Sequence, residues 1–116
     1  MKSFSFPKDQ RLLNRKDFVN LNHAGKRYRT DNFTVLSKKN GLIFTRLGIT
    51  VNRRIGNAVR RNRIKRLVRE FFRLNKESFQ KGYDLIVIAN RGAHDLEFND
   101  IKEELGNMIF VKKNNI

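Results

Sequence analysis

Residues 53–73 read RRIGNAVRRNRIKRLVREFFR, a segment with nine arginines and lysines and the single acid Glu70. Apolar residues recur through it at helical spacing, which predicts an amphipathic helix with one packed face and one solvated face. Asn57 has the side chain of a helix N-cap, and Gly82 is a residue suited to end a helix. The sequence therefore predicts one long helix over residues 57–81.

The predicted helix separates its apolar residues from its cations. At about 100° per residue, the apolar side chains fall in one continuous arc, which comprises Ile64, Leu67, Val68, Phe71, Phe72 and Leu74. The opposite arc holds Arg61, Asn62, Arg63, Lys65, Arg66, Arg69 and Arg73, and the small residues Ala58 and Val59 lie on the same side one turn earlier. One face can therefore pack while the other carries the charge.

The charged arc allows two interpretations. A charged run on an amphipathic helix is usually just the solvated face of that helix. Here, however, like charges repeat four residues apart at Arg61, Lys65 and Arg69, and each such pair costs about 0.2–0.5 kcal/mol in the free protein. Arginines also crowd the predicted helix N-terminus, where the macrodipole disfavours cations. Because bound phosphates reverse the sign of both effects, the pattern favours a nucleic-acid-binding face.

The composition of the whole chain supports a polyanionic partner. A chain of 116 residues with 39% apolar residues can bury one core, so we expect a single domain over residues 1–116. Its formal net charge of +15 favours nucleic acid as the partner over an anionic membrane. The longest purely apolar stretch, Leu85–Ala89, is too short to span a bilayer, and the absence of cysteine fits a reducing compartment. We therefore expect a cytoplasmic protein with no membrane partner.

The remaining elements follow from local patterns. The stretch LLNRKDFVNLNHAG predicts a first helix with Asn14 as N-cap and Gly25 as stop. Residues 28–52 alternate as strands around Asn40-Gly41, which predicts an antiparallel hairpin with a short third strand at residues 28–30.

Two more elements complete the predicted order. The run YDLIVIA predicts a buried strand, and a final amphipathic helix is indicated by Phe98, Ile101, Leu105, Met108 and Ile109. The predicted order is αβββαβα, an α+β sandwich of a central sheet with helices.

The stretch GNAVRRNRIKRLVRE, which follows a strand pattern ending LGITVNRR, resembles the signature of the protein subunit of bacterial ribonuclease P. The triplet Arg61-Asn62-Arg63 with Lys65, Arg66 and Arg69 is similar to the RNR motif of that family. The resemblance extends through RLLNRKDF, FTVL, RLGITV and YDLIVIA, and so covers nearly the whole chain.

The resemblance implies a small basic cofactor of a catalytic RNA. Together the two remove the 5′ leader from precursor tRNA, and the RNA supplies the active site and Mg²⁺. The implied partners are this RNA and precursor tRNA, with one protein per RNA. The resemblance also implies a left-handed βαβ crossover through the long helix, although handedness rules alone predict a right-handed one.

Two binding surfaces are carried over from the family. The catalytic RNA would contact Arg53, Arg54, Arg61, Asn62, Arg63, Lys65, Arg66 and Arg69. The single-stranded leader would lie in a cleft between the first helix and the sheet, lined by Phe18, Asn22, Phe33 and Leu36. Phe18 and Phe33 match aromatic positions of the family, although core packing alone would also explain them. Asn22 and Leu36 depart from its aromatics, which would weaken base stacking.

The residues of the chain do not suggest a nuclease active site in the protein itself. His23 and His94 are far apart in sequence, and the acids of residues 95–104 are spaced like a solvated helix start. We expect no catalytic residue, no protein metal site and no cleavage by the isolated protein. The alternative function is a non-catalytic ribosomal or general structured-RNA-binding protein. A DNA-binding helix-turn-helix is disfavoured because the basic helix follows a strand.

Overall fold

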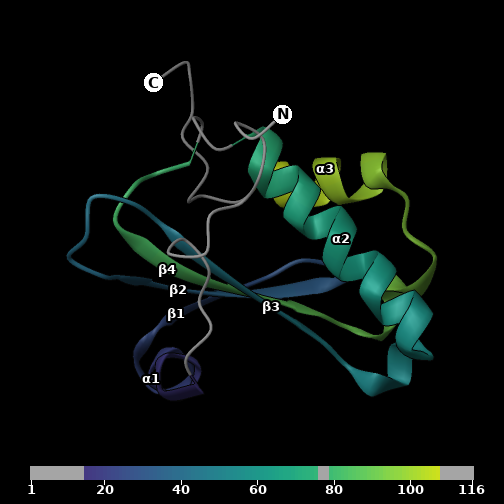
Figure 1. Ribbon diagram of the computed structural model, residues 1–116, viewed down its shortest axis with the longest axis horizontal. Helices are drawn as coiled ribbons and strands as arrows, with labels where there is room; N and C mark the ends of the chain where they lie inside the picture. The colour runs from purple at the N-terminus through teal and green to yellow at the C-terminus, as the bar shows by residue number, and fades with distance from the viewer. Residues whose placement is uncertain (1–14, 76–78, 108–116) are drawn as a thin grey trace.

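The computed structural model describes residues 15–75 and 79–107 and has a mixed α+β fold. A four-stranded sheet lies between helix α1 on one face and helices α2 and α3 on the other (Figure 1). The elements in chain order are α1 (Arg15–Ala24), β1 (Lys26–Arg29), β2 (Phe33–Lys39), β3 (Arg46–Val51), the 3-10 turn η3 (Arg53–Ile55), α2 (Ala58–Leu74), β4 (Tyr83–Ala89), the 3-10 turn η5 (Arg91–Asp95) and α3 (Phe98–Gly106). The predicted order αβββαβα is confirmed.

The sheet is not built on the predicted hairpin. Its strand order is β1-β2-β4-β3, so β4 lies between the two strands that flank Asn40-Gly41. Strand β2 pairs antiparallel with both β1 and β4, whereas β3 pairs parallel with β4. The hairpin prediction is wrong because β4 takes the central position between β2 and β3. There its apolar side chains are covered on both faces and both of its edges are hydrogen-bonded.

The long basic helix is the crossover between the parallel strands β3 and β4, but it is shorter than predicted. It ends at Leu74, and the Asn75 backbone N–H donates to the Phe71 carbonyl. The rings of Phe72 and Phe79 have centroids 4.5 Å apart, whereas residues seven apart in a helix are separated by about 10 Å along its axis. Phe79 therefore does not continue the helix. Gly82, predicted to end the helix, instead has φ of 84° in the turn that enters β4.

The outer helices follow the predictions within the described residues. Helix α1 ends where the Gly25 N–H donates to the Leu21 carbonyl at 2.9 Å. Helix α3 begins at Phe98 as predicted and ends at Gly106. The predicted cap Asn14 and the predicted helix positions Met108 and Ile109 lie outside the described residues.

The core has two parts, one on each face of the sheet. The larger part lies under α2 and α3 and includes Phe33, Val35, Leu47, Ile64, Val68, Phe71, Phe72, Leu85, Val87, Ile101 and Leu105. The smaller part lies under α1 and comprises Leu21, Leu36 and Ile86. The predicted packing arc of α2 is confirmed except at Leu74, which is 53% exposed because the helix ends there. Packing of one face thus holds α2 with its cationic face outward.

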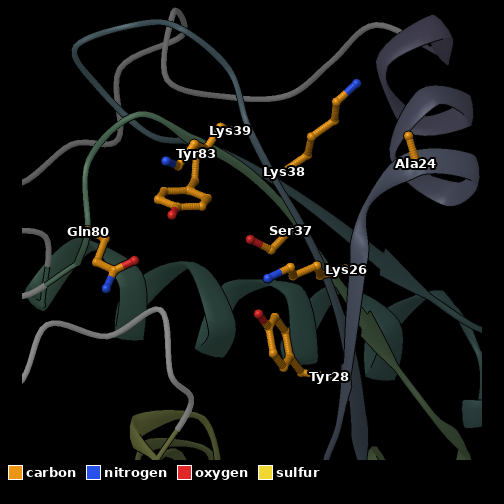
Figure 2. Close-up of a pocket in the computed structure, with 8 residues that line it drawn as sticks. All are labelled: Ala24, Lys26, Tyr28, Ser37, Lys38, Lys39, Gln80 and Tyr83. Carbon is orange, nitrogen blue, oxygen red and sulfur yellow. The ribbon is translucent and has the colours of Figure 1, made fainter.

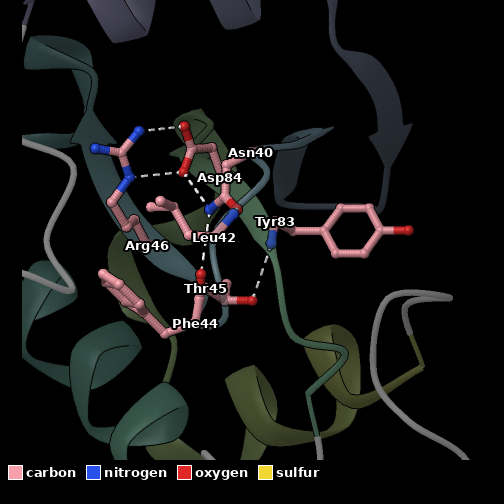
Figure 3. Close-up of polar contacts among 7 residues, drawn as sticks. All are labelled: Asn40, Leu42, Phe44, Thr45, Arg46, Tyr83 and Asp84. Carbon is pink, nitrogen blue, oxygen red and sulfur yellow. Dashed lines mark hydrogen bonds and ion pairs between the residues drawn. The ribbon is translucent and has the colours of Figure 1, made fainter.

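A polar network ties the loop after β2 to the start of β4 (Figure 3). The buried Asp84 carboxylate accepts from Arg46 Nε at 2.8 Å and Nη2 at 2.6 Å, and from Asn40 Nδ2 at 2.9 Å. The Asn40 amide also donates to the Phe44 carbonyl, and the Thr45 hydroxyl donates to the Gln80 carbonyl. Because Arg46 and Asp84 are register partners, this pair fixes the parallel pairing of β3 with β4 at its first residue.

We expect the variant Arg46→Ala to lose about 2–3 kcal/mol of unfolding free energy, because it leaves the Asp84 charge buried without its cation. Equilibrium urea unfolding measures the loss. Adding Asp84→Asn should recover most of it, because that change removes the charge. The matched control Lys102→Ala, at an exposed site on α3, should stay within about 0.5 kcal/mol. If Arg46→Ala lost no more unfolding free energy than Lys102→Ala, the stabilising role of the Arg46–Asp84 pair would be contradicted.

Candidate nucleic-acid interface

The basic surface is built at the corner where β3 turns into α2. Asn52 Oδ1 accepts from the Arg54 N–H at 2.8 Å, and Asn57 Oδ1 accepts from the Arg60 N–H at 3.0 Å. Between these two caps Gly56 has φ of 152°, a conformation that side-chain-bearing residues rarely adopt. The corner therefore holds the η3 arginines next to the N-terminus of α2.

Most of the predicted RNA-contacting side chains are accessible on this surface. Arg53, Arg54, Asn62, Arg66 and Arg69 are exposed, and Arg61, Arg63 and Lys65 are half-buried. Within residues 15–75 and 79–107, no ion pair neutralises Arg53, Arg54, Arg61, Lys65, Arg66 or Arg69. These six cations therefore repel one another across η3 and one side of α2 unless an external anion binds.

Arg63 differs from the other cations of the motif because it is engaged inside the protein. Its Nη1 donates to the Leu96 carbonyl at 2.8 Å, and its Nη2 pairs with Glu97 Oε1 at 2.9 Å. Glu97 is the N-cap residue of α3. The Arg63 guanidinium therefore joins α2 to the start of α3, a role that the sequence analysis did not foresee.

The outer face of α2 differs between its two ends: an ion pair lies at the C-terminal end, and small exposed residues lie at the N-terminal end. At the C-terminal end Arg73 pairs with Glu70, the only acid of the segment, and is thereby partly neutralised. At the N-terminal end Val59 is 76% exposed, and the neighbouring Ala58 is exposed as well. Small side chains there leave the first turn and its free N–H groups accessible to a phosphate backbone.

The second predicted surface, between α1 and the sheet, is only partly supported by the side-chain positions. Leu36 lies on the α1 face but is buried against Leu21 and Ile86. Phe33 points to the other face and is 0% exposed in the core under α2. Its assignment to the cleft is therefore corrected in favour of core packing. Phe18 and Asn22 lie one turn apart on α1, and their side chains are outside the described part.

The edge strand β1 adds cations that the sequence analysis missed. Arg27 and Arg29 pair in register with Leu36 and Thr34, which places them on the α1 face at the sheet edge. Both are exposed. The signal that could have found them is the alternation in Lys26-Arg27-Tyr28-Arg29, because alternate residues of a strand point to opposite faces.

The described residues do not form a site for a metal ion. Over residues 15–75 and 79–107, no three His, Cys, Asp or Glu side chains are grouped so that they could hold one. The resemblance implies Mg²⁺ supplied by the RNA, and these segments of the protein contain no cluster that would hold the ion instead. In the same segments, no helix is long and apolar enough to cross a membrane.

An α+β domain whose η3 turn and basic helix face together have six cations without a counter-charge in the described residues has the electrostatic character of a small nucleic-acid-binding protein. The family model described as Ribonuclease P matches residues 6–113 of this chain. The chain therefore belongs to the ribonuclease P protein family.

Similar sequences and solved structures support this family membership. The chain is 42% identical over 116 residues to the ribonuclease P protein component of Syntrophus aciditrophicus, covering 100% of this chain and 98% of the relative. Among solved structures, the RNase P protein from Thermotoga maritima matches with a TM-score of 0.79 at 42% identity, covering 84% of this chain and 92% of that one. The Staphylococcus aureus RNase P protein matches with a TM-score of 0.79 at 35% identity, covering 84% and 89%.

These superpositions also bear on the crossover. A βαβ unit of opposite hand would not superpose on a homologue over 84% of the chain. The crossover through α2 therefore has the hand of the family, which is the left-handed one that the resemblance implied.

We expect Arg63→Ala to lower the free energy of unfolding by about 1 kcal/mol, because it removes a charged hydrogen bond to the Leu96 carbonyl. The exposed pair with Glu97 should add little to this loss. Urea unfolding at low and high salt measures it. Arg66→Ala, exposed on the same helix, is the matched control and should change stability by less than about 0.5 kcal/mol. Equal stability of the two variants would contradict the bracing role of Arg63.

Proposed function

We propose that the chain acts as the protein component of ribonuclease P and binds the catalytic RNA through the corner formed by η3 and α2. The observation that carries the proposal is the row of cations there without a counter-charge in the described residues. The proposed contacts are Arg53, Arg54, Arg61, Asn62, Lys65, Arg66 and Arg69. Arg63, the remaining residue of the motif, contributes by holding α3, and its exposed portion adds to the local positive charge.

The chemistry of this surface suits a folded RNA. Guanidinium groups bind phosphate oxygens in a bidentate manner, so several arginines on one rigid helix match several phosphates at fixed spacing. The side chain of Asn62, in the middle of the row, can both donate and accept hydrogen bonds. The free N–H groups of the first turn of α2 favour another phosphate.

The 5′ leader of precursor tRNA is the proposed ligand of the α1 face of the sheet. Support comes from Arg27 and Arg29, which extend the positive charge onto that face, and from α1, which carries Phe18 and Asn22. Leu36 underlies this surface as part of the small core. Positive edge residues beside a helix suit a single strand, which is bound through its backbone and through stacking.

The protein assists a reaction whose active site we place in the RNA. The ribonuclease P family is Mg²⁺-dependent, and we propose that the RNA of the holoenzyme holds most of this Mg²⁺. A protein that neutralises backbone phosphates lowers the repulsion that the cation must otherwise screen. We further propose one protein per RNA, action in the cytoplasm and a single RNA-binding domain over residues 1–116. The alternative of a ribosomal or general RNA-binding protein is disfavoured by the family match over residues 6–113.

Reconstitution tests this function. Adding the protein to a bacterial ribonuclease P RNA should accelerate removal of the precursor-tRNA leader at low Mg²⁺, where the RNA alone is slow, because the protein supplies part of the missing positive charge. Gel analysis of the 5′-labelled product measures the rate. Two controls are the RNA alone and rigorously RNA-free protein, and the latter should not cut. Mg²⁺-dependent cleavage by the protein alone would contradict an active site in the RNA.

Individual arginines can be tested through the salt dependence of assembly. We expect Arg66→Ala or Arg61→Ala to weaken binding of the ribonuclease P RNA. Each variant should also make the negative slope of log K against log salt shallower, by about one unit for each phosphate that it no longer neutralises. Filter binding over a series of salt concentrations measures the slope. Lys102→Ala removes the same charge from α3 and should leave the slope unchanged. An unchanged slope in Arg66→Ala would remove this residue from the interface.

A further inference from the structure

A pocket lies at the β1 edge of the sheet, apart from both surfaces described above (Figure 2). Its volume is about 360 Å³, within the range of small-ligand sites. The residues that line it come from the end of α1, from β1 and β2, and from the entry to β4: Ala24, Lys26, Tyr28, Ser37, Lys38, Lys39, Gln80 and Tyr83. The lining includes no residue of α2 or η3.

Strand register explains why these side chains meet. Lys26 is the partner of Ser37, Tyr28 of Val35, and Tyr83 of Lys39. Because partners in register share a face, the pocket lies on the same face as Val35 and the α2 core. Leu36 and the α1 surface are on the opposite face. The side chains of Lys26, Tyr28, Ser37, Lys39 and Tyr83 therefore lie across the sheet from Leu36, whereas Ala24 and Lys38 line the pocket from the α1 side.

Polar groups converge on the pocket. Figure 2 shows the Lys26 ammonium, the hydroxyls of Tyr28, Ser37 and Tyr83, and the Gln80 amide pointing into a common space, whereas Lys38 points away toward α1. Ser37 is a buried polar residue. In the part of the chain that the structure describes, the side chains of Lys26, Tyr28, Ser37 and Tyr83 make no hydrogen bond or ion pair with one another or with other residues.

The lining indicates the chemistry of the ligand. Lys26 and Lys39, which the register places on the pocket's face of the sheet, favour an anion, since the described lining residues include no carboxylate. The rings of Tyr28 and Tyr83, both half-buried, offer planar surfaces on which a base can stack. Hydroxyls and an amide both donate and accept, so they can bind the edge of a base. A simple phosphate would use the lysines but not the exposed parts of the two rings, whose other parts pack against the α2 core.

We infer that this pocket binds a single phosphorylated nucleotide, with the phosphate at Lys26 and Lys39 and the base against Tyr28 and Tyr83. Such a nucleotide has two sources, a free mononucleotide or an unpaired nucleotide of an RNA strand. This site is independent of the proposed binding of the catalytic RNA by α2, because the two surfaces share no residue.

Titration of the full-length ¹⁵N-labelled protein with AMP, GMP, CMP or UMP, or with a 5′-phosphorylated ribopentamer, tests the inference. Amide signals of β1, of the end of β2 and of the start of β4 should shift at lower concentrations of the nucleotides than those of α2, whose cations bind the phosphate alone. Binding of mononucleotides indicates the free source, and binding of the pentamer alone indicates an RNA strand. Shifts confined to α2, or no shift with any probe, would overturn the site.

Variants separate the pocket from general charge. Lys26→Gln should weaken nucleotide binding about tenfold, since it removes a charge-assisted contact. Lys102→Gln makes the same change of charge outside the pocket and should weaken binding less than twofold. Tyr83→Phe keeps the ring and removes one hydroxyl, so it should weaken binding two- to fivefold. It serves as the second variant if the spectrum of Lys26→Gln lacks the dispersion of a folded protein. Equal weakening by Lys26→Gln and Lys102→Gln would overturn the site.

Competitors test the class of ligand. Inorganic phosphate should displace AMP only at a concentration at least tenfold above that of AMP, because it lacks the base. Equal competition by phosphate, or by a polyglutamate peptide of the same charge, would overturn the assignment to a nucleotide. RNA assembly of Lys26→Gln, measured by filter binding with the ribonuclease P RNA, should match that of the unsubstituted protein. This last measurement distinguishes failure of the pocket from failure of the proposed function.

Discussion

The central position of β4 is the constraint on which the rest of the structure depends. This strand pairs antiparallel with β2 and parallel with β3, and its side chains contribute to the cores on both faces of the sheet. A parallel pair cannot be joined by a tight turn, so the chain must cross over the sheet between β3 and β4. Helix α2 is that crossover, and its apolar face therefore covers the larger core while its cations face outward.

The charge of α2 opposes folding only until an anion binds. Packing of Ile64, Val68 and Phe71 holds the helix in place despite the repulsion along its outer face. The Asp84–Arg46 pair also stabilises the crossover, because it fixes the register of β3 against β4, the two strands that α2 connects. Bound phosphates relieve the repulsion present in the free protein, so the charges that weaken the free fold favour the proposed binding of RNA.

The helices and the basic face could be predicted closely from local patterns. The Asn57 cap, the apolar arc up to Phe72 and the stop of α1 each depend on residues within a few positions, and the structure confirms them. The strand pairing could not be predicted in this way. Asn40-Gly41 is a valid turn signal, and Gly41 has φ of 74°, but turn chemistry does not say which strand the chain pairs with next. The wrong assignment of Phe33 to the cleft has a similar cause. Alternation shows which residues of a strand share a face, but it does not show which helix covers that face.

By itself the sequence determined the element order, the apolar and charged sides of the basic helix, and the family, because these depend on short-range periodicity and on motif spacing. Only the tertiary structure decided that β4 separates β2 from β3, that Arg63 is engaged by α3, and that lysines and tyrosines from three strands and their connections enclose a pocket. These features join residues that are from 10 to more than 50 positions apart in the chain. Their proximity results from competition among whole elements for buried positions, which no local pattern records.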